Sequence, residues 1–311
     1  MPVESRRKKF RRPAASKNGL GGRKPARGAG KPCETAFGRR RNRLDYQHVY
    51  AVISQRARGL SIGVNLNPDK KCSFDCVYCE VDHETAGRER TVDVKAMAAE
   101  LEHLLTMQQG GRLGKLDWFK NLPPELLELK EVALSGDGEP TLCPNFDEVV
   151  REVVHLRSRG DRPSFKIVLI TNGTGVDSPR VAAGLELLDP QDEIWVKLDA
   201  GTQEYFEKVN RPMVPLWQIL AKILALSKKR PVIIQSLFPL IDGKEPSVEE
   251  VEQYVKRLSE LKAVGAQISM VQVYSAHRPP HRPNCGHLPL KSLSFIAQRV
   301  RKATGLKAEV F

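Results

Sequence analysis

The stretch Lys71-Cys-Ser-Phe-Asp-Cys-Val-Tyr-Cys-Glu80 holds three cysteines, Cys72, Cys76 and Cys79, in a C-x3-C-x2-C spacing. Thiolates this close in the chain can each bind one corner of a cubic iron–sulfur cluster, which has four irons and usually takes four cysteines. With three protein thiolates, the fourth iron is open to a chelating ligand. The stretch therefore predicts a [4Fe–4S] cluster that also binds a small molecule.

Other uses of these cysteines have weaker support. A structural zinc site takes four ligands, usually as two pairs of cysteine or histidine, and no second pair follows at such a spacing. His83 is the candidate for a fourth zinc ligand. A disulfide framework requires an oxidising compartment, which nothing in the sequence indicates. An electron-transfer ferredoxin would add a fourth cysteine followed by proline.

The stretch resembles the signature loop of radical S-adenosylmethionine (SAM) enzymes, in which an aromatic residue, here Tyr78, precedes the last cysteine. Together with Ser61-Ile-Gly-Val-Asn-Leu66 it is similar to the wyosine-synthase-like (Fe–S oxidoreductase) branch, over residues 58–300. The resemblance implies one [4Fe–4S] cluster, with SAM bound at the open iron and Tyr78 near the cofactor. It also implies reductive cleavage of SAM to a 5′-deoxyadenosyl radical, with electrons from a donor of the flavodoxin or ferredoxin type.

The charge of the chain is concentrated at one end. The net charge is +13, and residues 1–43 carry 15 lysines and arginines against two glutamates, so the remaining residues have 35 basic and 35 acidic side chains. This segment has too few apolar residues to form a core. We expect residues 1–45 to be a disordered basic tail that binds RNA, and residues 46–311 to form the radical SAM domain. Alternatively, this segment is a solubilising extension, an organelle-targeting segment, or a stretch that precedes the true start site of translation.

Composition also bears on the compartment. No apolar run approaches the roughly 20 residues that a membrane-spanning helix needs, and no hydrophobic signal segment opens the sequence. The six cysteines are scattered or clustered as in proteins of a reducing compartment. We therefore expect a cytoplasmic enzyme that does not contact membranes.

Six apolar segments alternate with amphipathic segments of helical period, which favours an α/β fold with parallel strands. The period does not distinguish an open sheet from a barrel. The resemblance implies the partial (β/α)6 TIM-type barrel. Asp93 is expected to cap the first helix, and Ser247 with Glu250 is expected to form a capping box. The predicted strands are Leu60–Leu66, Glu131–Ser135, Lys166–Ile170, Glu193–Leu198, Val232–Leu237 and Ala266–Val273.

A glycine-rich turn follows the second predicted strand, at the edge where parallel strands end and ligands bind. Gly136, Gly138 and Glu139 match the family motif that meets the amino group of SAM. Glycines allow close approach of the backbone to a ligand, and a carboxylate accepts hydrogen bonds from an ammonium. A plain glycine turn is the alternative.

Other polar residues end later strands. Asn172 and Asp199 are candidates for contacts with the ribose or carboxylate of SAM, or for residues that stabilise turns. Lys197, on the same side as Asp199, is expected to be solvated. The resemblance places Gln272, Tyr274 and Arg278 toward the substrate. Four residues nearby match no metal-site spacing, and the sequence does not tell whether they bind anything: His277, His281, Cys285 and His287.

The substrate and the residues that act on it are not determined by these motifs. Wyosine synthases of the pyruvate-using kind have a second cluster, held by three cysteines before the SAM loop, whereas only Cys33 precedes Cys72 here. We therefore expect no second cluster and leave the substrate unassigned, with RNA modification as one candidate. The rivals are an activase that forms a glycyl radical on a partner protein and a non-catalytic iron–sulfur or zinc module that binds nucleic acid.

The basic tail generates the first testable prediction. Each phosphate that a lysine or arginine neutralises releases counterions, so RNA binding by the tail should weaken steeply between about 50 and 200 mM salt. Filter binding to bulk tRNA should show this dependence for the full chain and little binding for a chain starting near Asp45. The shortened chain should still bind iron and cleave SAM. Equal RNA affinities for both chains would contradict an RNA-binding role for the tail.

Overall fold

The computed structural model describes residues 44–85, 87, 89–160, 164–276, 280, 282 and 284–311. Almost all of the predicted tail lies outside these residues, and so does Arg278. The boundary between tail and domain near residue 45 therefore stays a prediction. All the other predicted site residues can be placed.

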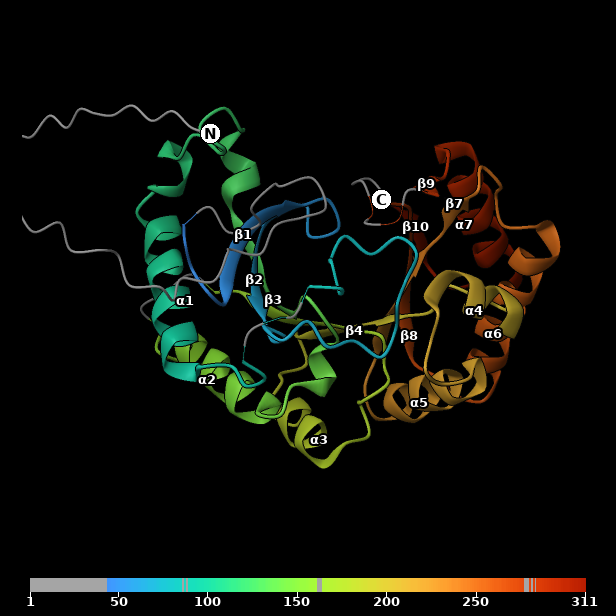
Figure 1. Cartoon of the computed structure of the whole chain (residues 1–311), viewed down its shortest axis with the longest axis horizontal. Helices are drawn as coiled ribbons and strands as arrows, with labels where there is room; N and C mark the ends of the chain where they lie inside the picture. Colours follow the sequence, from blue (N-terminus) through green and yellow to red (C-terminus); the bar gives the residue numbers. More distant parts are fainter. Residues whose placement is uncertain are drawn as a thin grey trace, which may run out of the picture. The chain divides into compact units, whose positions relative to one another are not determined.

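An eight-stranded sheet forms the centre of the fold (Figure 1). Its strands lie in the order β1-β2-β3-β4-β5-β6-β8-β10, and all neighbouring pairs are parallel except β1 with β2. A separate antiparallel pair is formed by β7 (Pro239–Ile241) and β9 (Cys285–His287). The bounds in the large sheet are β1 Val49–Ser54, β2 Gly59–Asn65, β3 Leu129–Ser135, β4 Lys166–Thr171, β5 Glu193–Lys197, β6 Val232–Leu237, β8 Ile268–Tyr274 and β10 Ala308–Val310.

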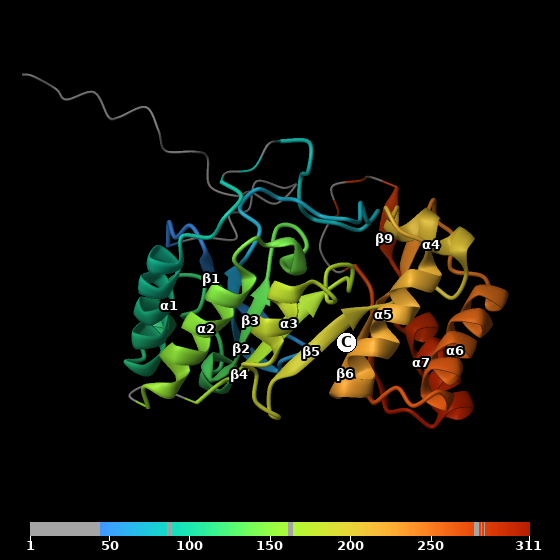
Figure 2. The same ribbon diagram turned by 90° about the horizontal axis from the view of Figure 1, so that it is seen from below.

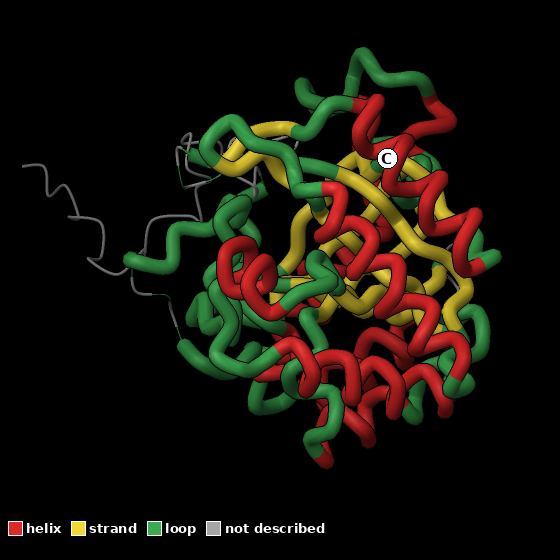
Figure 3. The backbone as a smooth tube through the Cα atoms, turned by 90° about the vertical axis from the view of Figure 1, so that its right-hand side faces the viewer, coloured by secondary structure: helices red, strands yellow, loops and turns green. Residues whose placement is uncertain are grey.

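The helices cover the outer face of this sheet, and the strands surround an interior (Figures 2 and 3). Alternate strand residues such as Ile62 and Val132 are fully buried in the large apolar cluster that includes helix residues such as Leu101. The opposite face carries a smaller interior cluster around Trp195. The helices are α1 Val94–Gln109, α2 Phe146–Ser158, α3 Pro179–Leu185, α4 Gln203–Asn210, α5 Leu216–Lys229, α6 Val248–Ala263 and α7 Leu290–Thr304, with short 3-10 helices at Leu113–Lys115, Pro124–Leu127 and Pro140–Leu142.

The predicted fold class is confirmed: the six predicted strands are parallel and joined through helices in a partial TIM-type barrel, and the short β10 adds a seventh parallel strand. The sequence analysis missed β1, which forms an antiparallel hairpin with β2 through the turn 55–58. This turn contains none of the Gly-rich pairs that mark hairpins; Arg58 itself adopts the left-handed φ of 57°. The three-residue strands β7, β9 and β10 are too short to produce a detectable period.

The two predicted helix caps differ in outcome. The Asp93 side chain accepts a hydrogen bond from the Ala96 N–H, as predicted. Ser247 likewise accepts from the Glu250 N–H, but the Glu250 carboxylate does not complete the box. It accepts instead from the Gly201 N–H at 2.6 Å and from the Thr202 hydroxyl. Glu250 is buried, so it satisfies donors of the β5–α4 loop rather than the end of its own helix.

A buried ion pair ties α2 to the start of β5. The Arg157 guanidinium donates to both carboxylate oxygens of Asp192, at 2.5 and 3.1 Å. The Asp192 side chain is fully buried and also accepts from the Ile167 N–H at 2.7 Å. Arg157 is thus the cation that hydrogen-bonds to this carboxylate, which also fixes the start of β4.

Replacing that cation should destabilise the fold. Arg157→Met leaves a buried carboxylate without its partner, so we expect a loss of about 3–5 kcal/mol in the free energy of unfolding, measured in urea. The matched control is Arg151→Met on the same helix, whose side chain is 61% exposed and lies 4.0 Å from Asp147. The control should change the stability by less than about 0.5 kcal/mol. Equal effects of the two substitutions would contradict this account.

Candidate cluster and cofactor site

The cysteine loop, residues 66–83, connects the end of β2 to the segment before α1 and is anchored on the C-terminal end of α4. The Asp75 N–H donates to the Asn210 carbonyl at 3.0 Å, and the Val77 N–H donates to the Val209 carbonyl at 2.9 Å. These two hydrogen bonds fix the backbone of the loop against α4.

The glycine turn after β3 contacts the other side of this loop. The Glu139 N–H donates to the Lys71 carbonyl at 2.9 Å. A Cβ atom on Gly138 would lie 1.9 Å from the Lys71 carbonyl oxygen, and one on Gly136 would lie 2.3 Å from the Asn67 side-chain oxygen. Gly138 thus permits contact between the turn and the residue before Cys72, and Gly136 permits contact with Asn67 at the start of the loop. Their predicted contacts with SAM stay predictions.

Each cysteine sulfur has a polar neighbour. Cys72 Sγ accepts from the Phe74 N–H at 3.4 Å, and Asn172 Nδ2 is 3.7 Å away. Cys76 Sγ accepts from Asn210 Nδ2 at 3.4 Å, and Cys79 Sγ lies 3.4 Å from His83 Nε2. Hydrogen bonds to sulfur stabilise the thiolates that hold iron–sulfur clusters.

Burial has the opposite effect on two of these cysteines, because it disfavours the thiolate and raises the pKa of the thiol. It raises the pKa of Cys76 to about 12, although Lys197 lowers it, and burial likewise raises the pKa of Cys72. A metal that binds Cys72 and Cys76 must therefore displace a proton from each of these two sulfurs. Among the described residues, no group of three histidine, cysteine or acidic side chains is placed to hold a single metal ion. A cube is compatible with this arrangement because each cysteine binds a different iron.

The Glu139 carboxylate is fully engaged with the chain's own groups. It is 2% exposed and accepts from the Thr141 N–H at 3.0 Å, from the Asn172 N–H at 2.7 Å, and from the hydroxyls of Thr141 and Thr171. Burial raises its pKa despite these donors. Its clear role is to join the turns after β3 and β4, and the direct bond to the SAM ammonium stays a prediction.

Asn172 connects the end of β4 to the cysteine loop. Its Nδ2 donates to Ser73 Oγ at 3.0 Å, and its Oδ1 accepts from the Thr174 N–H and hydroxyl. The alternative role, stabilising a turn, is thus present in the structure. A contact between Asn172 and SAM stays a prediction.

Asp199, at the end of β5, is the centre of a buried polar network. One of its oxygens accepts from the Tyr78 hydroxyl and, at 2.7 Å, from Asn210 Nδ2, and the other accepts from the Leu237 N–H at 2.8 Å. These bonds occupy Asp199 within the protein and position the Tyr78 ring. Any contact of either residue with SAM stays a prediction.

The expectation that Lys197 is solvated was wrong. Its side chain is 16% exposed, and its Nζ lies 3.5 Å from an Asp199 oxygen and 3.4 Å from the Tyr274 hydroxyl. Nζ also lies 4.9 Å from the centre of the Tyr78 ring. Burial acts to lower the lysine pKa, but the neighbouring Asp199 and Tyr274 outweigh it and raise that pKa above its usual value. Lys197 is therefore a buried ammonium beside the cysteine loop.

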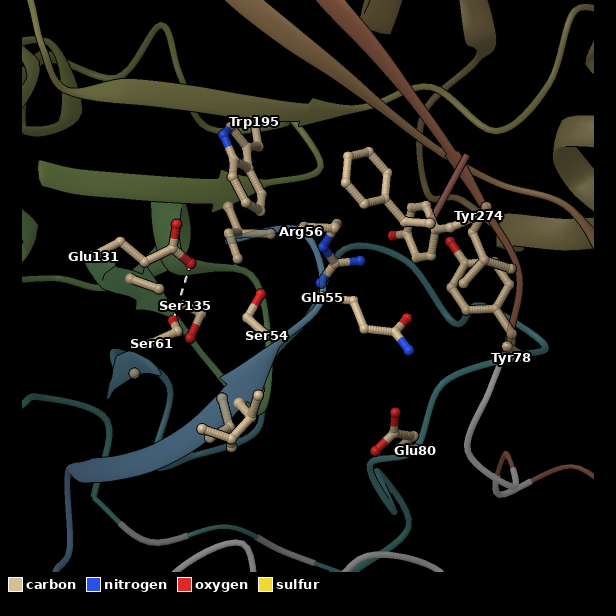
Figure 4. A pocket seen from close by; sticks show the side chains of 18 of the residues that line it. Ser54, Gln55, Arg56, Ser61, Tyr78, Glu80, Glu131, Ser135, Trp195 and Tyr274 are labelled. Carbon is tan, nitrogen blue, oxygen red and sulfur yellow. Dashed lines mark hydrogen bonds between the residues drawn. The ribbon is translucent and has the colours of Figure 1, made fainter. Parts of the chain in front are cut away.

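A cavity of about 500 Å³ lies inside the barrel, next to the cysteine loop (Figure 4). Tyr274 lines it, and its predicted contact with the substrate stays a prediction. Gln272 is 1% exposed and accepts from Gln235 Nε2 at 3.4 Å, but it is not among the lining residues. Sequence reasoning missed three other lining residues, Tyr50, Arg56 and Glu131, because two of them belong to the unpredicted hairpin.

The two described cysteines outside the loop, Cys143 and Cys285, are buried. Cys143 is buried, and its thiol lies 3.4 Å from the Asn145 side-chain oxygen. Cys285 is buried in an apolar cluster with Val77 and Tyr78. His287 is exposed on β9, and the other two histidines of that group lie outside the described residues.

Comparison with known proteins agrees with the geometry of the loop and the barrel. The family model of the radical SAM superfamily matches residues 66–258, which is more than half of the chain. The chain belongs to the radical SAM superfamily. Membership indicates an enzyme, and the superfamily uses an iron–sulfur cluster and SAM. In the part of the chain that the structure describes, no helix is sufficiently long and apolar to span a membrane.

Several curated relatives are similar over much of the chain. A UPF0026 protein of Helicobacter pylori is 24% identical over 234 residues, which cover 75% of this chain and 68% of the relative. The SAM-dependent tRNA 4-demethylwyosine synthase of Pyrococcus abyssi is 27% identical over 220 residues. That match covers 67% of this chain and 59% of the synthase.

Solved structures share the fold at low sequence identity. TYW1 with a lysine-pyruvate adduct bound has a TM-score of 0.50 and 17% identity, and the match covers 84% of this chain and 85% of that one. Streptococcus suis SuiB bound to its precursor peptide SuiA has a TM-score of 0.54 and 13% identity, covering 79% and 47% of the two chains. At these identities the likeness supports the barrel fold alone.

The glycine turn offers a test of how the cysteine loop is positioned. Gly138→Ala adds a methyl group against the Lys71 carbonyl, and such overpacking costs about 1–3 kcal/mol. The displaced loop should bind much less iron on anaerobic reconstitution, measured by iron content. The control Gly286→Ala places its Cβ no closer than 3.6 Å to any atom and should retain full iron binding. Full iron binding by Gly138→Ala would show that the close contact is not required.

Proposed function

We propose that this enzyme binds one [4Fe–4S] cluster through Cys72, Cys76 and Cys79 and uses it to cleave SAM reductively. The observation that supports this most is the arrangement of the cysteine loop, in which each thiol lies beside a nitrogen that can hydrogen-bond to sulfur. Reduced by a donor of the flavodoxin or ferredoxin type, a cluster held by these cysteines would pass one electron to the sulfonium of bound SAM. Cleavage of the S–C5′ bond would then give methionine and a 5′-deoxyadenosyl radical for hydrogen abstraction from a substrate.

The chain's own residues position and shield this chemistry. Asn210 donates to both Cys76 and Asp199, and so couples the loop to the end of β5. The Lys197 ammonium compensates negative charge near Cys76, where burial otherwise opposes a thiolate. The residues that we propose for contacts with SAM surround the loop at the carboxyl ends of the strands: Tyr78, Gly136, Gly138, Glu139, Asn172 and Asp199.

An RNA substrate is the second proposal. Two features support it: the excess of basic residues before residue 44, and the similarity to an enzyme whose name identifies it as a tRNA-modifying synthase. The absence of a second group of cysteines before Cys72 sets this chain apart from the pyruvate-using wyosine synthases, so the product is expected to differ from theirs.

Anaerobic reconstitution tests the cluster and the reaction together. The full chain should bind about four irons and form 5′-deoxyadenosine from SAM when a strong reductant is added. Alanine at any one of the three cysteines should abolish the visible absorption of the cluster and the 5′-deoxyadenosine. Cys143→Ala, a buried cysteine outside the loop, should retain both.

Four outcomes would contradict the proposal or redirect it. A full cluster in the triple cysteine variant would place the cluster elsewhere. Zinc without iron in anaerobically purified protein, or an intact cluster without SAM cleavage, would favour the non-catalytic nucleic-acid module. A glycyl radical on a partner protein, seen by electron paramagnetic resonance, would identify an activase.

A further inference from the structure

The β1–β2 hairpin crosses the open side of the barrel. β1 and β10 are the two edge strands of the sheet, so they have no hydrogen bonds to each other. The hairpin turn bridges them, because Arg58 Nη2 on the turn lies 3.0 Å from Glu309 Oε2 on β10. Arg58 is the outward member of this turn, and Arg56 points into the cavity (Figure 4).

Arg56 is held by two aromatic rings and has no anion. The carbon of its guanidinium lies 4.6 Å from the centre of the Tyr274 ring and 5.7 Å from that of Trp195. Its Nε is buried and has no hydrogen-bond partner. Stacking of this kind fixes the plane of a guanidinium and leaves its N–H groups free to bind a carboxylate or phosphate in bidentate fashion.

Glu131, on β3, lines the same cavity and forms no ion pair with a described residue, although the charges of Lys166 and Arg56 act on its carboxylate from farther away. Its side chain is 1% exposed; Oε1 accepts from the Ser61 hydroxyl at 2.9 Å, and Oε2 has no partner. The nearby Glu193 provides a contrast, because Lys166 and the Trp195 indole N–H each donate to it at 2.8 Å. Burial raises the pKa of Glu131, which means that a donor or cation bound there would gain free energy.

These two charges do not satisfy each other. Among the described residues, neither Arg56 nor Glu131 forms an ion pair, although both line one cavity of about 500 Å³. Buried polar groups in proteins nearly always have partners, so a cavity in which an acid and a base each keep a polar atom without a partner indicates a ligand that complements both. Tyr78 and Cys79 of the cysteine loop line the same cavity.

We infer that this cavity binds a small zwitterionic substrate, an amino-acid-like molecule whose ammonium contacts Glu131 and whose carboxylate contacts Arg56. The inference rests on the proposed SAM chemistry, for which it names the substrate class. The hairpin then serves as the wall that recognises the acidic end of the substrate, and β3 recognises the basic end.

A nucleotide is the less favoured occupant. Trp195 and Tyr274, two of the five aromatic residues that line the cavity, lie against the Arg56 guanidinium and are not free to stack a base. A phosphate has no cationic end for Glu131 to bind. RNA contact through the basic tail is a separate question.

Ligand-detected NMR on the full chain tests the inference with probes of defined charge. The probes are glycine, 4-aminobutyrate and 6-aminohexanoate, with hexanoate, hexylamine and AMP as comparisons. We expect saturable binding of at least one amino acid, with its singly charged analogue at least about tenfold weaker, as for loss of one charged hydrogen bond. Arg56→Met and Glu131→Gln should each weaken binding about tenfold or more, and Arg151→Met, on the outer surface, should leave it unchanged.

The outcomes separate this inference from the proposed function. Iron content and 5′-deoxyadenosine formation are measured on the same variants, so a misfolded variant is recognised by loss of iron. SAM cleavage by the wild-type chain without saturable binding of any amino acid would overturn the inference and leave the proposed function intact. Binding of AMP that depends on Arg56, with none of the amino acids bound, would overturn it in favour of a nucleotide. Amino-acid binding without SAM cleavage would contradict the proposed function instead.

Discussion

The contact between the glycine turn and the cysteine loop is the constraint on which the site depends. With a Cβ on Gly138 only 1.9 Å from the Lys71 carbonyl oxygen, the two segments can approach this closely only without a side chain there. The backbone hydrogen bond from Glu139 to Lys71 then fixes the residue before Cys72. The ends of two adjacent parallel strands thereby determine where the first thiol lies.

Each buried carboxylate near this contact has its own partners. Glu139 accepts hydrogen bonds from the turns after β3 and β4, whereas Asp199 has Lys197 as a cation and Tyr78 as a donor. A buried carboxylate without such partners would cost several kcal/mol. The same partners hold the cysteine loop from two sides. The contacts that satisfy the buried carboxylates are therefore also the contacts that fix the loop.

The cavity departs from this balance. Arg56 and Glu131 face it from opposite elements, and each keeps a polar atom without a partner. Unsatisfied groups of this kind are uncommon in folded proteins and concentrate at functional sites. Arg56 lies on the turn that joins the added strand β1 to the barrel, whereas Glu131 belongs to the barrel strand β3.

The sequence by itself determined the six parallel strands, their helices and the three cysteines, because these depend on local period and spacing. It also located the polar residues that end the strands, since parallel strands end at one edge. Only the tertiary structure decided what these residues contact: Glu139 and Asn172 hold the cysteine loop, Lys197 is buried, and Glu250 binds the β5–α4 loop rather than its own helix end. The hairpin and the presence of Arg56 and Glu131 in one cavity also required it. The physical reason is that hydrogen-bond partners and unpaired charges are set by residues tens of positions apart, such as Glu139 with Asn172, whose proximity no local pattern encodes.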